Sequence, residues 1–208
     1  MKNFRIFLAE EDGLHENEWL RKSDNEHLGS DSGKIARKLR RTQKLQPGDM
    51  KHIRDYAEDG SDVNSHIHEA HHKGVAIHPA YHEMVDRLDK ISNRPIGHHL
   101  HAYSGTTDPR QHMNDQHIMH NPAYTSLSHE KREARYHAGY ADRNSSDIHM
   151  LHVHLKPTDK AGFIGGGQHE SLLPRHSQLA INPKPSVFKT DESSKKLHVW
   201  HATVHHQD

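Results

Sequence analysis

The chain has 208 residues, of which 31% are hydrophobic, and its 28 acidic residues balance its 28 lysines and arginines. This balance argues against a molecule-wide basic surface for nucleic acid, and the absence of cysteine excludes disulfide bridges and cysteine nucleophiles. No apolar run approaches the roughly 20 residues of a membrane-spanning helix. We therefore expect a soluble protein with a small core and no membrane contact.

The first 45 residues are polar and predict an N-terminal extension ahead of one domain at residues 46–208. Residues 29–33, Gly-Ser-Asp-Ser-Gly, indicate a linker within it. Residues 34–44 are rich in lysine and arginine and carry Ile35 and Leu39 four positions apart, which is typical of an amphipathic helix. A solvated basic face explains this helix more simply than contact with nucleic acid or a partner.

Helices are expected next, and strands follow them. Prolines open helices at residues 47–56 and 79–92, and a serine caps a helix at residues 61–72 between them. A fourth helix is expected at residues 129–140. Strands are predicted at residues 100–103, 123–126, 150–155, 178–181 and 197–204. Helices followed by strands predict an α+β domain with packed sheets.

Two polar motifs in the second half of the chain suggest a site. Gln168 and Glu170 are separated by one residue, so both side chains share one face of an extended segment. Upstream, residues 124–128 read Tyr-Thr-Ser-Leu-Ser, the edge of a strand that runs into a serine-capped helix, where a ligand can bind. Without this upstream motif, the pair after the glycines at residues 165–167 would be a solvated polar turn.

Together these motifs resemble the mono-ADP-ribosyltransferases of the exoenzyme and phage type. That family carries Q-x-E or E-x-E before an apolar pair and proline, as in residues 168–174, and an upstream S-T-S strand, where this chain has residues 126–128. Residues 56–64 are similar to its N-terminal Y-T-x-x-x-S-x-x-I-N signature. The resemblance spans residues 47–185. It implies an ADP-ribosyltransferase-like α+β fold, with a helical layer followed by two packed β-sheets around an NAD cleft.

The resemblance also implies a reaction, with NAD as the substrate. The nicotinamide–ribose bond breaks through an oxocarbenium-like centre that a carboxylate stabilises, so Glu170 would be the catalytic residue. By position, Ser126 would hold Glu170, and Gln168 would contact the acceptor. Relatives with glutamine at this place favour amide or base nitrogens over arginine. We expect a host protein as the acceptor, with nucleic acid as the alternative.

One departure concerns the grip on NAD. The resemblance implies these cofactor-binding residues: Tyr103, Ser104, Gly105, Ser126, Ser128 and Phe163. The family reads Tyr-Arg-Gly where this chain has Tyr-Ser-Gly, and the hydroxyl of Ser104 cannot make an arginine's bidentate bonds to phosphate. Unless Arg94, Arg110 or His101 compensates, the alternative is a catalytically weak or inactive NAD-binding protein.

The N-terminus carries a second resemblance. Residues 1–4, Met-Lys-Asn-Phe, are similar to leaders of proteins packaged in the heads of T-even-type phages, whose protease cuts after Leu-x-Glu or Ile-x-Glu. Residues 8–10 read Leu-Ala-Glu. This resemblance implies a virion-packaged effector that is delivered into the host cytoplasm, with a processed leader at its start. An ordinary first strand or helix is the alternative.

The 26 histidines supply a minor alternative. Residues 68–72 contain H-E-x-x-H, which on a helix places two imidazoles for zinc and a glutamate base, as in metalloproteases. In a chain this rich in histidine, random order gives about 0.2 such matches. We therefore assign no residue to a metal and expect only incidental metal binding by some histidines.

Overall fold

The computed structural model describes residues 14–25, 27–28, 32–141, 147–164, 170–191 and 194–206. The expected linker centre, the Leu-Ala-Glu sequence and Gln168 lie outside these residues. Within the described ranges, no helix combines the length and apolar character needed to cross a bilayer.

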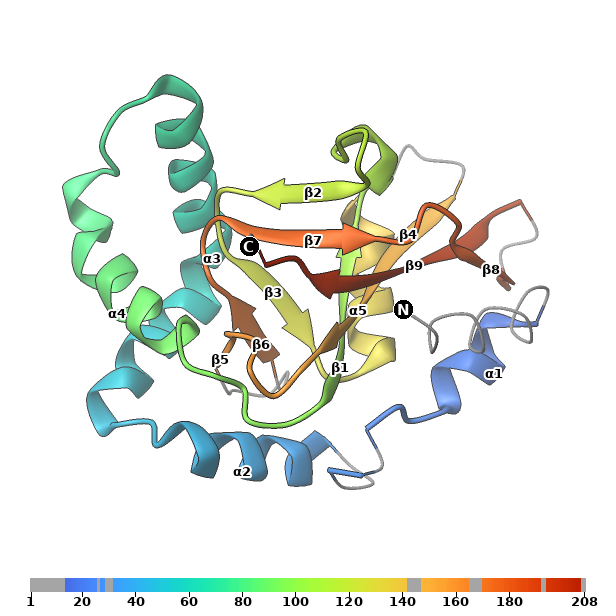
Figure 1. Cartoon of the computed structure of the whole chain (residues 1–208), viewed down its shortest axis with the longest axis horizontal. Coiled ribbons are helices and arrows are strands. Elements are labelled where there is room, and N and C mark those ends of the chain that lie inside the picture. The colour runs from blue at the N-terminus through green and yellow to red at the C-terminus, as the bar shows by residue number, and fades with distance from the viewer. Residues whose placement is uncertain are drawn as a thin grey trace.

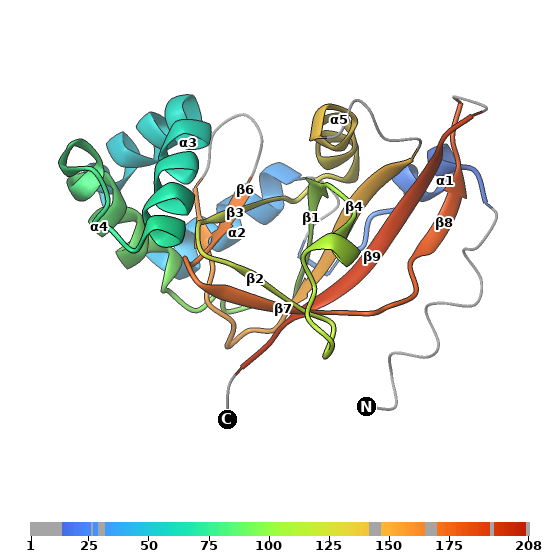
Figure 2. The ribbon, with the colours of Figure 1, turned by 90° about the horizontal axis from the view of Figure 1, so that it is seen from above.

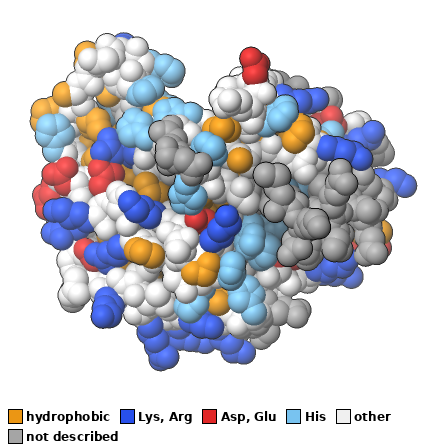
Figure 3. All heavy atoms as spheres, viewed as in Figure 1, with side chains coloured by type: hydrophobic (Ala, Val, Ile, Leu, Met, Phe, Trp, Pro, Cys, Tyr) orange, Lys and Arg blue, Asp and Glu red, His pale blue; other side chains and the backbone are white. Residues whose placement is uncertain are grey.

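Helices precede the first strand, as predicted. They are α1 (Glu16–Arg21), α2 (Ser32–Gln43), α3 (Pro47–Lys73), the 3-10 turn η1 (Pro79–Tyr81) and α4 (His82–Ser92). The amphipathic pattern in the extension is confirmed, because Ile35 and Leu39 are buried in α2 while its lysines and arginines are exposed. Figure 3 shows basic side chains gathered along the edge of the molecule where α2 lies in Figure 1.

The predicted helix break at Ser61 is wrong, since α3 runs through it without interruption. Ile53, Tyr56, Val63 and Ile67 form one buried stripe that continues past this point, so packing overrides the local preference of a serine for a helix start. The helix ends at Gly74, whose φ of 63° is the left-handed conformation of a glycine cap. Figure 1 shows α3 and α4 together at one end of the sheet.

Nine strands form the sheet. They are β1 (Leu100–Thr106), β2 (Ile118–Asn121), β3 (Thr125–Ser128), β4 (Ile148–Leu155), β5 (Gly162–Phe163), β6 (Glu170–Leu173), β7 (Ser177–Ile181), β8 (Ser186–Lys189) and β9 (Lys196–Val204). Their order is β2-β7-β9-β4-β1-β3-β6-β5, with β8 beside β9. Only β4 and β9 pair in parallel among the described strands. The fold is therefore α+β with a mixed sheet.

The expected two packed sheets are joined into one. The link is narrow, because β1 and β3 share a single registered pair, Tyr103 with Ser128, whereas β1 and β4 are paired over seven residues of each strand. Few hydrogen bonds of the ladder therefore join β1 to β3. Strands that separate at one end leave space between them, and this junction positions the cavity described below.

The helix α5 (Lys131–Ala141) packs on β1, and Figure 2 shows it on one side of the sheet, over β1 and β4. It begins two residues later than predicted. Gly105 permits this close approach, because a Cβ at that position would lie 2.4 Å from the Ala138 nitrogen. The helix α1 packs on the same side of the sheet, where its Trp19 is buried and meets the Tyr103 ring edge-on at 5.9 Å between centroids.

Candidate active site

A cavity of about 320 Å³ opens where β1 and β3 separate. Residues from α3, β1, β3, α5 and β6 form its walls. Six residues that the sequence singled out line it: Tyr103, Ser104, Gly105, Ser126, Ser128 and Glu170. The structure thus brings together segments that are as far apart in the chain as α3 and β6.

The strand register explains this convergence. Ser126 and Ser128 are two positions apart in β3, so their side chains lie on one face of the strand. In the antiparallel pairing of β3 with β6, Ser128 lies opposite Glu170. Directly paired residues also share a face, so the two serines and the glutamate are placed on the same side.

Glu170 is half-buried at the start of β6. Burial raises the pKa of its carboxyl above the ordinary value, the nearby His137 imidazole lowers it in part, and the Glu133 carboxylate raises it further. Such an ionised carboxylate is poorly solvated. It therefore interacts more strongly with a positive charge that develops next to it than a carboxylate in bulk water does.

Tyr56 and Asn64 are part of the site, although the sequence pointed only to their segment and gave neither a role. The Tyr56 hydroxyl accepts a hydrogen bond from Asn64 Nδ2 at 3.0 Å and has a second hydrogen bond with the side chain of Ser126. Burial raises the pKa of Tyr56, those two hydrogen bonds lower it in part, and the charge of Glu170 raises it again. Tyr56 therefore contacts the serine and lies near enough to the glutamate to feel its charge.

Asn64 ties α3 to the start of β3. Its side-chain amide donates to the Tyr124 carbonyl at 3.3 Å and accepts from the Tyr124 N–H, also at 3.3 Å. The tyrosine and asparagine of the 56–64 segment, eight residues apart on α3, thus hold the strand that carries Ser126. These contacts explain why a tyrosine and an asparagine stand eight residues apart in this segment.

No family model and no curated protein matches the chain by sequence. Solved structures do match. The toxin Plx2a of Paenibacillus larvae, an ADP-ribosyltransferase, superposes with a TM-score of 0.64 over 89% of this chain and 98% of its own, at 16% identity. C3stau2 of S. aureus, solved with NAD, gives a TM-score of 0.58 over 85% of this chain and 95% of its own, at 20% identity.

This chain has the ADP-ribosyltransferase fold. A further match is the ADP-ribosylating toxin BECa of C. perfringens, solved with NADH, with a TM-score of 0.61 over 93% of this chain and 50% of that one, at 11% identity. At such identities the likeness establishes the fold. The expected fold class is therefore confirmed.

In this ADP-ribosyltransferase fold, Ser104 lies on the cavity wall where the family resemblance led us to expect an arginine. Its hydroxyl donates to the Gly105 carbonyl at 3.3 Å. Among the described residues that line the cavity, His137 is the one side chain that can carry a positive charge. The cavity is therefore poor in the cations that usually bind phosphate.

The three residues that were considered as substitutes for the missing arginine are engaged elsewhere. Arg94 pairs with the buried carboxylate of Asp49 at 3.3 Å, and Arg110 binds Asp108. His101 lies in a histidine cluster on β1 and β4. None of them lines the cavity, so the structure gives no support for their taking the place of the arginine.

Phe163 is placed in the core and not on the cavity wall. It is buried in β5, its N–H donates to Gln43 Oε1 at 2.7 Å, and its ring stacks on His129 with centroids 6.0 Å apart. The structure therefore gives no support to Phe163 as a cofactor-binding residue. The acceptor contact assigned to Gln168 stays a prediction, because that residue lies outside the described part of the chain.

The H-E-x-x-H motif lies on α3, as a helical motif should. The rings of His68 and His72 stack with centroids 6.4 Å apart, but Glu69 forms an exposed ion pair with Lys73 at 2.5 Å. Within the described residues, the one grouping with the spacing of metal ligands lies elsewhere, around Asp24. Among the residues that the structure describes, none therefore completes a zinc-protease site around this motif.

Proposed function

We propose that the protein is an NAD-dependent mono-ADP-ribosyltransferase that modifies a host macromolecule. The observation that carries the proposal is the position of Glu170, which lies beside Ser128 on a paired strand and lines one cavity together with Ser126 and Ser128 in an ADP-ribosyltransferase fold. Support also comes from two structures of this fold that were solved with NAD and NADH.

In the proposed reaction, the bond between nicotinamide nitrogen and ribose carbon breaks, and its electrons leave with nicotinamide. The ribose carbon becomes positively charged, and the Glu170 carboxylate stabilises that charge. A nucleophilic nitrogen of the acceptor then bonds to the same carbon and loses its proton. Ser126, which is held by Tyr56, positions the glutamate.

Gln168 precedes Glu170 by two residues, and we assign it the contact with the acceptor. The resemblance to relatives with glutamine at this place favours an amide or base nitrogen over arginine as the acceptor group. We propose a host protein as the acceptor, with nucleic acid as the alternative. The resemblance of the first ten residues to packaged phage leaders adds the proposal that the protein is delivered as a virion-borne effector.

A second candidate is an NAD-binding protein with weak or no catalysis. The cavity's lack of arginine and lysine among the described residues favours it. Ser104→Arg discriminates between the two candidates. A large rise in NAD turnover would indicate that the cavity has lost an arginine that binds the phosphates of NAD. Unchanged or lower turnover would indicate that this cavity binds NAD through its hydroxyl, amide and imidazole groups.

The proposal is tested with purified protein, labelled NAD and a bacterial lysate. Glu170→Gln is the paired variant because it keeps the size of the side chain and one acceptor oxygen and removes the charge. We expect label in macromolecules with the wild type and a loss of roughly 10²–10³-fold with the variant, the range for removing one electrostatic stabiliser. Protease and nuclease digestion then identify the acceptor class. Equal labelling by both proteins would contradict the proposal.

A further inference from the structure

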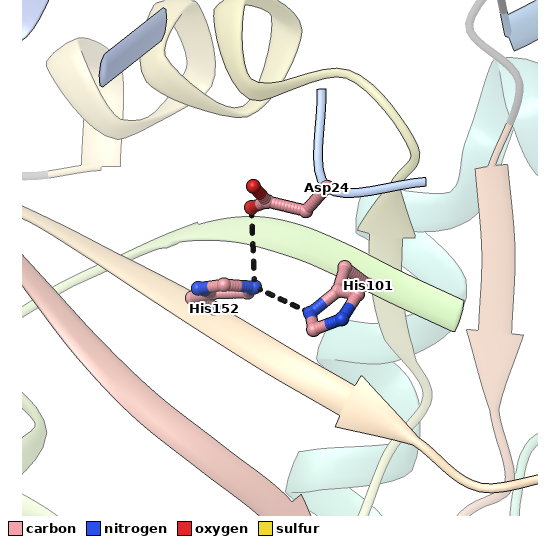
Figure 4. Close-up of side chains that lie close together, drawn as sticks. All are labelled: Asp24, His101 and His152. Atoms are coloured by element: carbon pink, nitrogen blue, oxygen red, sulfur yellow. Dashed lines mark hydrogen bonds and ion pairs between the residues drawn. The ribbon is translucent and has the colours of Figure 1, made fainter. Parts of the chain in front are cut away.

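A second cluster of polar side chains lies where the N-terminal extension contacts the sheet. It consists of Asp24, between α1 and α2, His101 of β1 and His152 of β4, and Figure 4 shows the three side chains converging. His101 Nδ1 lies 2.9 Å from His152 Nε2, and Asp24 Oδ2 lies 3.5 Å from that same nitrogen. One ligand atom from each residue lies within 4.8 Å of the other two.

The backbone fixes this arrangement. In the antiparallel ladder of β1 and β4, His101 pairs with His154 and Tyr103 with His152, so His101 and His152 are diagonal neighbours on one face. Asn25 next to Asp24 makes two hydrogen bonds to the main chain of His101, donating to its carbonyl at 2.6 Å and accepting from its N–H at 2.8 Å. Asp24 is thereby held over the two imidazoles.

We propose that Asp24, His101 and His152 form a binding site for one divalent transition-metal cation of the zinc class. Tetrahedral zinc with bonds of about 2.0–2.2 Å keeps its ligand atoms about 3.3 Å apart. The measured separations of 2.9 Å and 3.5 Å fall on either side of this value. Small side-chain rotations are therefore enough to admit the ion.

The donor set indicates the class of metal. Two imidazoles and one carboxylate suit zinc, cobalt, nickel or ferrous iron, whereas magnesium and calcium prefer oxygen ligands throughout. The three ligands leave at least one coordination position for water or another group. The site is independent of the proposed transferase activity, because none of the three residues lines the candidate cavity.

Two neighbours modulate Asp24. The Tyr103 hydroxyl donates to Asp24 Oδ2, and the buried Lys131 ammonium lies 3.1 Å from the same oxygen. Hydrogen bonds of this kind orient a ligating carboxylate. The ammonium charge, however, repels a bound cation and competes for Asp24. Its removal should therefore strengthen metal binding, which an ordinary structural ion pair would not predict.

Metal at this site would tie the extension to the sheet. Asp24 follows α1, whose Trp19 packs against Tyr103, and Tyr103 also forms part of the candidate cavity wall. A metal bridge from Asp24 to β1 and β4 would restrict movement of this layer. We expect bound metal to raise the thermal midpoint of unfolding of the whole protein.

The test uses the full chain without a histidine tag, stripped with a chelator and titrated with zinc chloride by calorimetry. Asp24→Asn and His152→Asn remove single ligands. A double variant, His68→Asn with His72→Asn, removes the histidine pair of the H-E-x-x-H motif on α3 as a matched control for incidental binding. We expect one tight zinc site in the wild type and the double variant, and affinity lower by roughly 100-fold or more in each single variant.

Lys131→Met separates metal binding from simple loss of packing. Like Asp24→Asn it breaks the ion pair, but it keeps the ligands, so we expect tighter zinc binding and a larger zinc-induced rise in thermal midpoint. Magnesium should cause no rise. Zinc binding of equal stoichiometry and affinity in the wild type and Asp24→Asn, or weaker binding in a folded Lys131→Met protein, would overturn the proposal.

Discussion

Gly105 offers a sharp test of how the candidate cavity is built. In Gly105→Ala the new Cβ would lie 2.4 Å from the nitrogen and 2.7 Å from the Cα of Ala138, and both are backbone atoms of α5. Ordinary carbon contacts need about 3.5 Å or more, so helix and strand must separate by about 1 Å. No side-chain rotation can relieve a contact with backbone.

The expected cost is that of overpacking a core, about 1–3 kcal/mol. For a domain of this size, 1 kcal/mol corresponds to about 2–4 °C in thermal midpoint, so we expect a fall of about 2–12 °C. Because α5 also carries Ala134 and His137 of the cavity wall, the shift should change the cavity's shape. We therefore expect a higher KM for NAD than in the wild type.

Gly139→Ala is the matched control, since it places the same methyl group on the same helix. Its Cβ would meet only Arg135 Nη1, at an ordinary 3.5 Å, and Gly139 is exposed. Replacing an exposed helical glycine by alanine should stabilise the protein by about 1 kcal/mol. Thermal unfolding by circular dichroism measures both variants. An equal midpoint for Gly105→Ala and the wild type would refute the packing of α5 on β1.

Three further predictions concern charge and hydrogen bonding. Burial raises the pKa of Glu170, so the carboxylate destabilises the folded state at neutral pH. We therefore expect Glu170→Gln to unfold at a higher temperature than the wild type at pH 7, and we expect this difference to vanish below the ordinary carboxyl pKa. A lower midpoint for the variant at pH 7 would contradict this reasoning. Burial raises the pKa of Asp89, but hydrogen bonding, above all from Arg175, outweighs it and brings the pKa below its usual value. Asp89 therefore stabilises the fold above the ordinary carboxyl pKa and loses that effect as pH falls through its own lower pKa, so Asp89→Asn should lower the midpoint more at pH 7 than in acid; an equal loss at both would argue against the ion pair. Tyr56→Phe keeps the ring and removes the hydroxyl that contacts Ser126. We therefore expect a loss of about 0.5–1.5 kcal/mol in unfolding free energy and a lower kcat for NAD hydrolysis than in the wild type. A kcat equal to that of the wild type would show that the Tyr56 hydroxyl has no part in the reaction.

The order of elements and part of the candidate site could be predicted from the sequence, because both rest on local patterns. Alternating residues predicted β4 and β9, and the serine and glutamate motifs pointed to Ser126 and Glu170. The register that sets Ser128 opposite Glu170 is a property of two strands. Sequence spacing alone does not fix such a pairing.

Other features depend on contacts between distant residues and could not be predicted. The continuous helix α3 follows from an apolar stripe that packs on other elements, not from Ser61 itself. Tyr56 gains its role only when α3 lies beside β3. Likewise, Asp24 meets His101 and His152 because Asn25 fixes the extension to the backbone of β1.

The central claim is that Glu170 makes this cavity an NAD-cleaving site. The most direct test is nicotinamide release from NAD, without an acceptor, by the wild type, Glu170→Gln and Glu69→Gln. Glu69 is the exposed glutamate of the H-E-x-x-H motif and serves as the control. We predict that the wild type and Glu69→Gln release nicotinamide at the same rate and that Glu170→Gln is slower by roughly 10²–10³-fold. Release by Glu170→Gln at the wild-type rate would contradict the account.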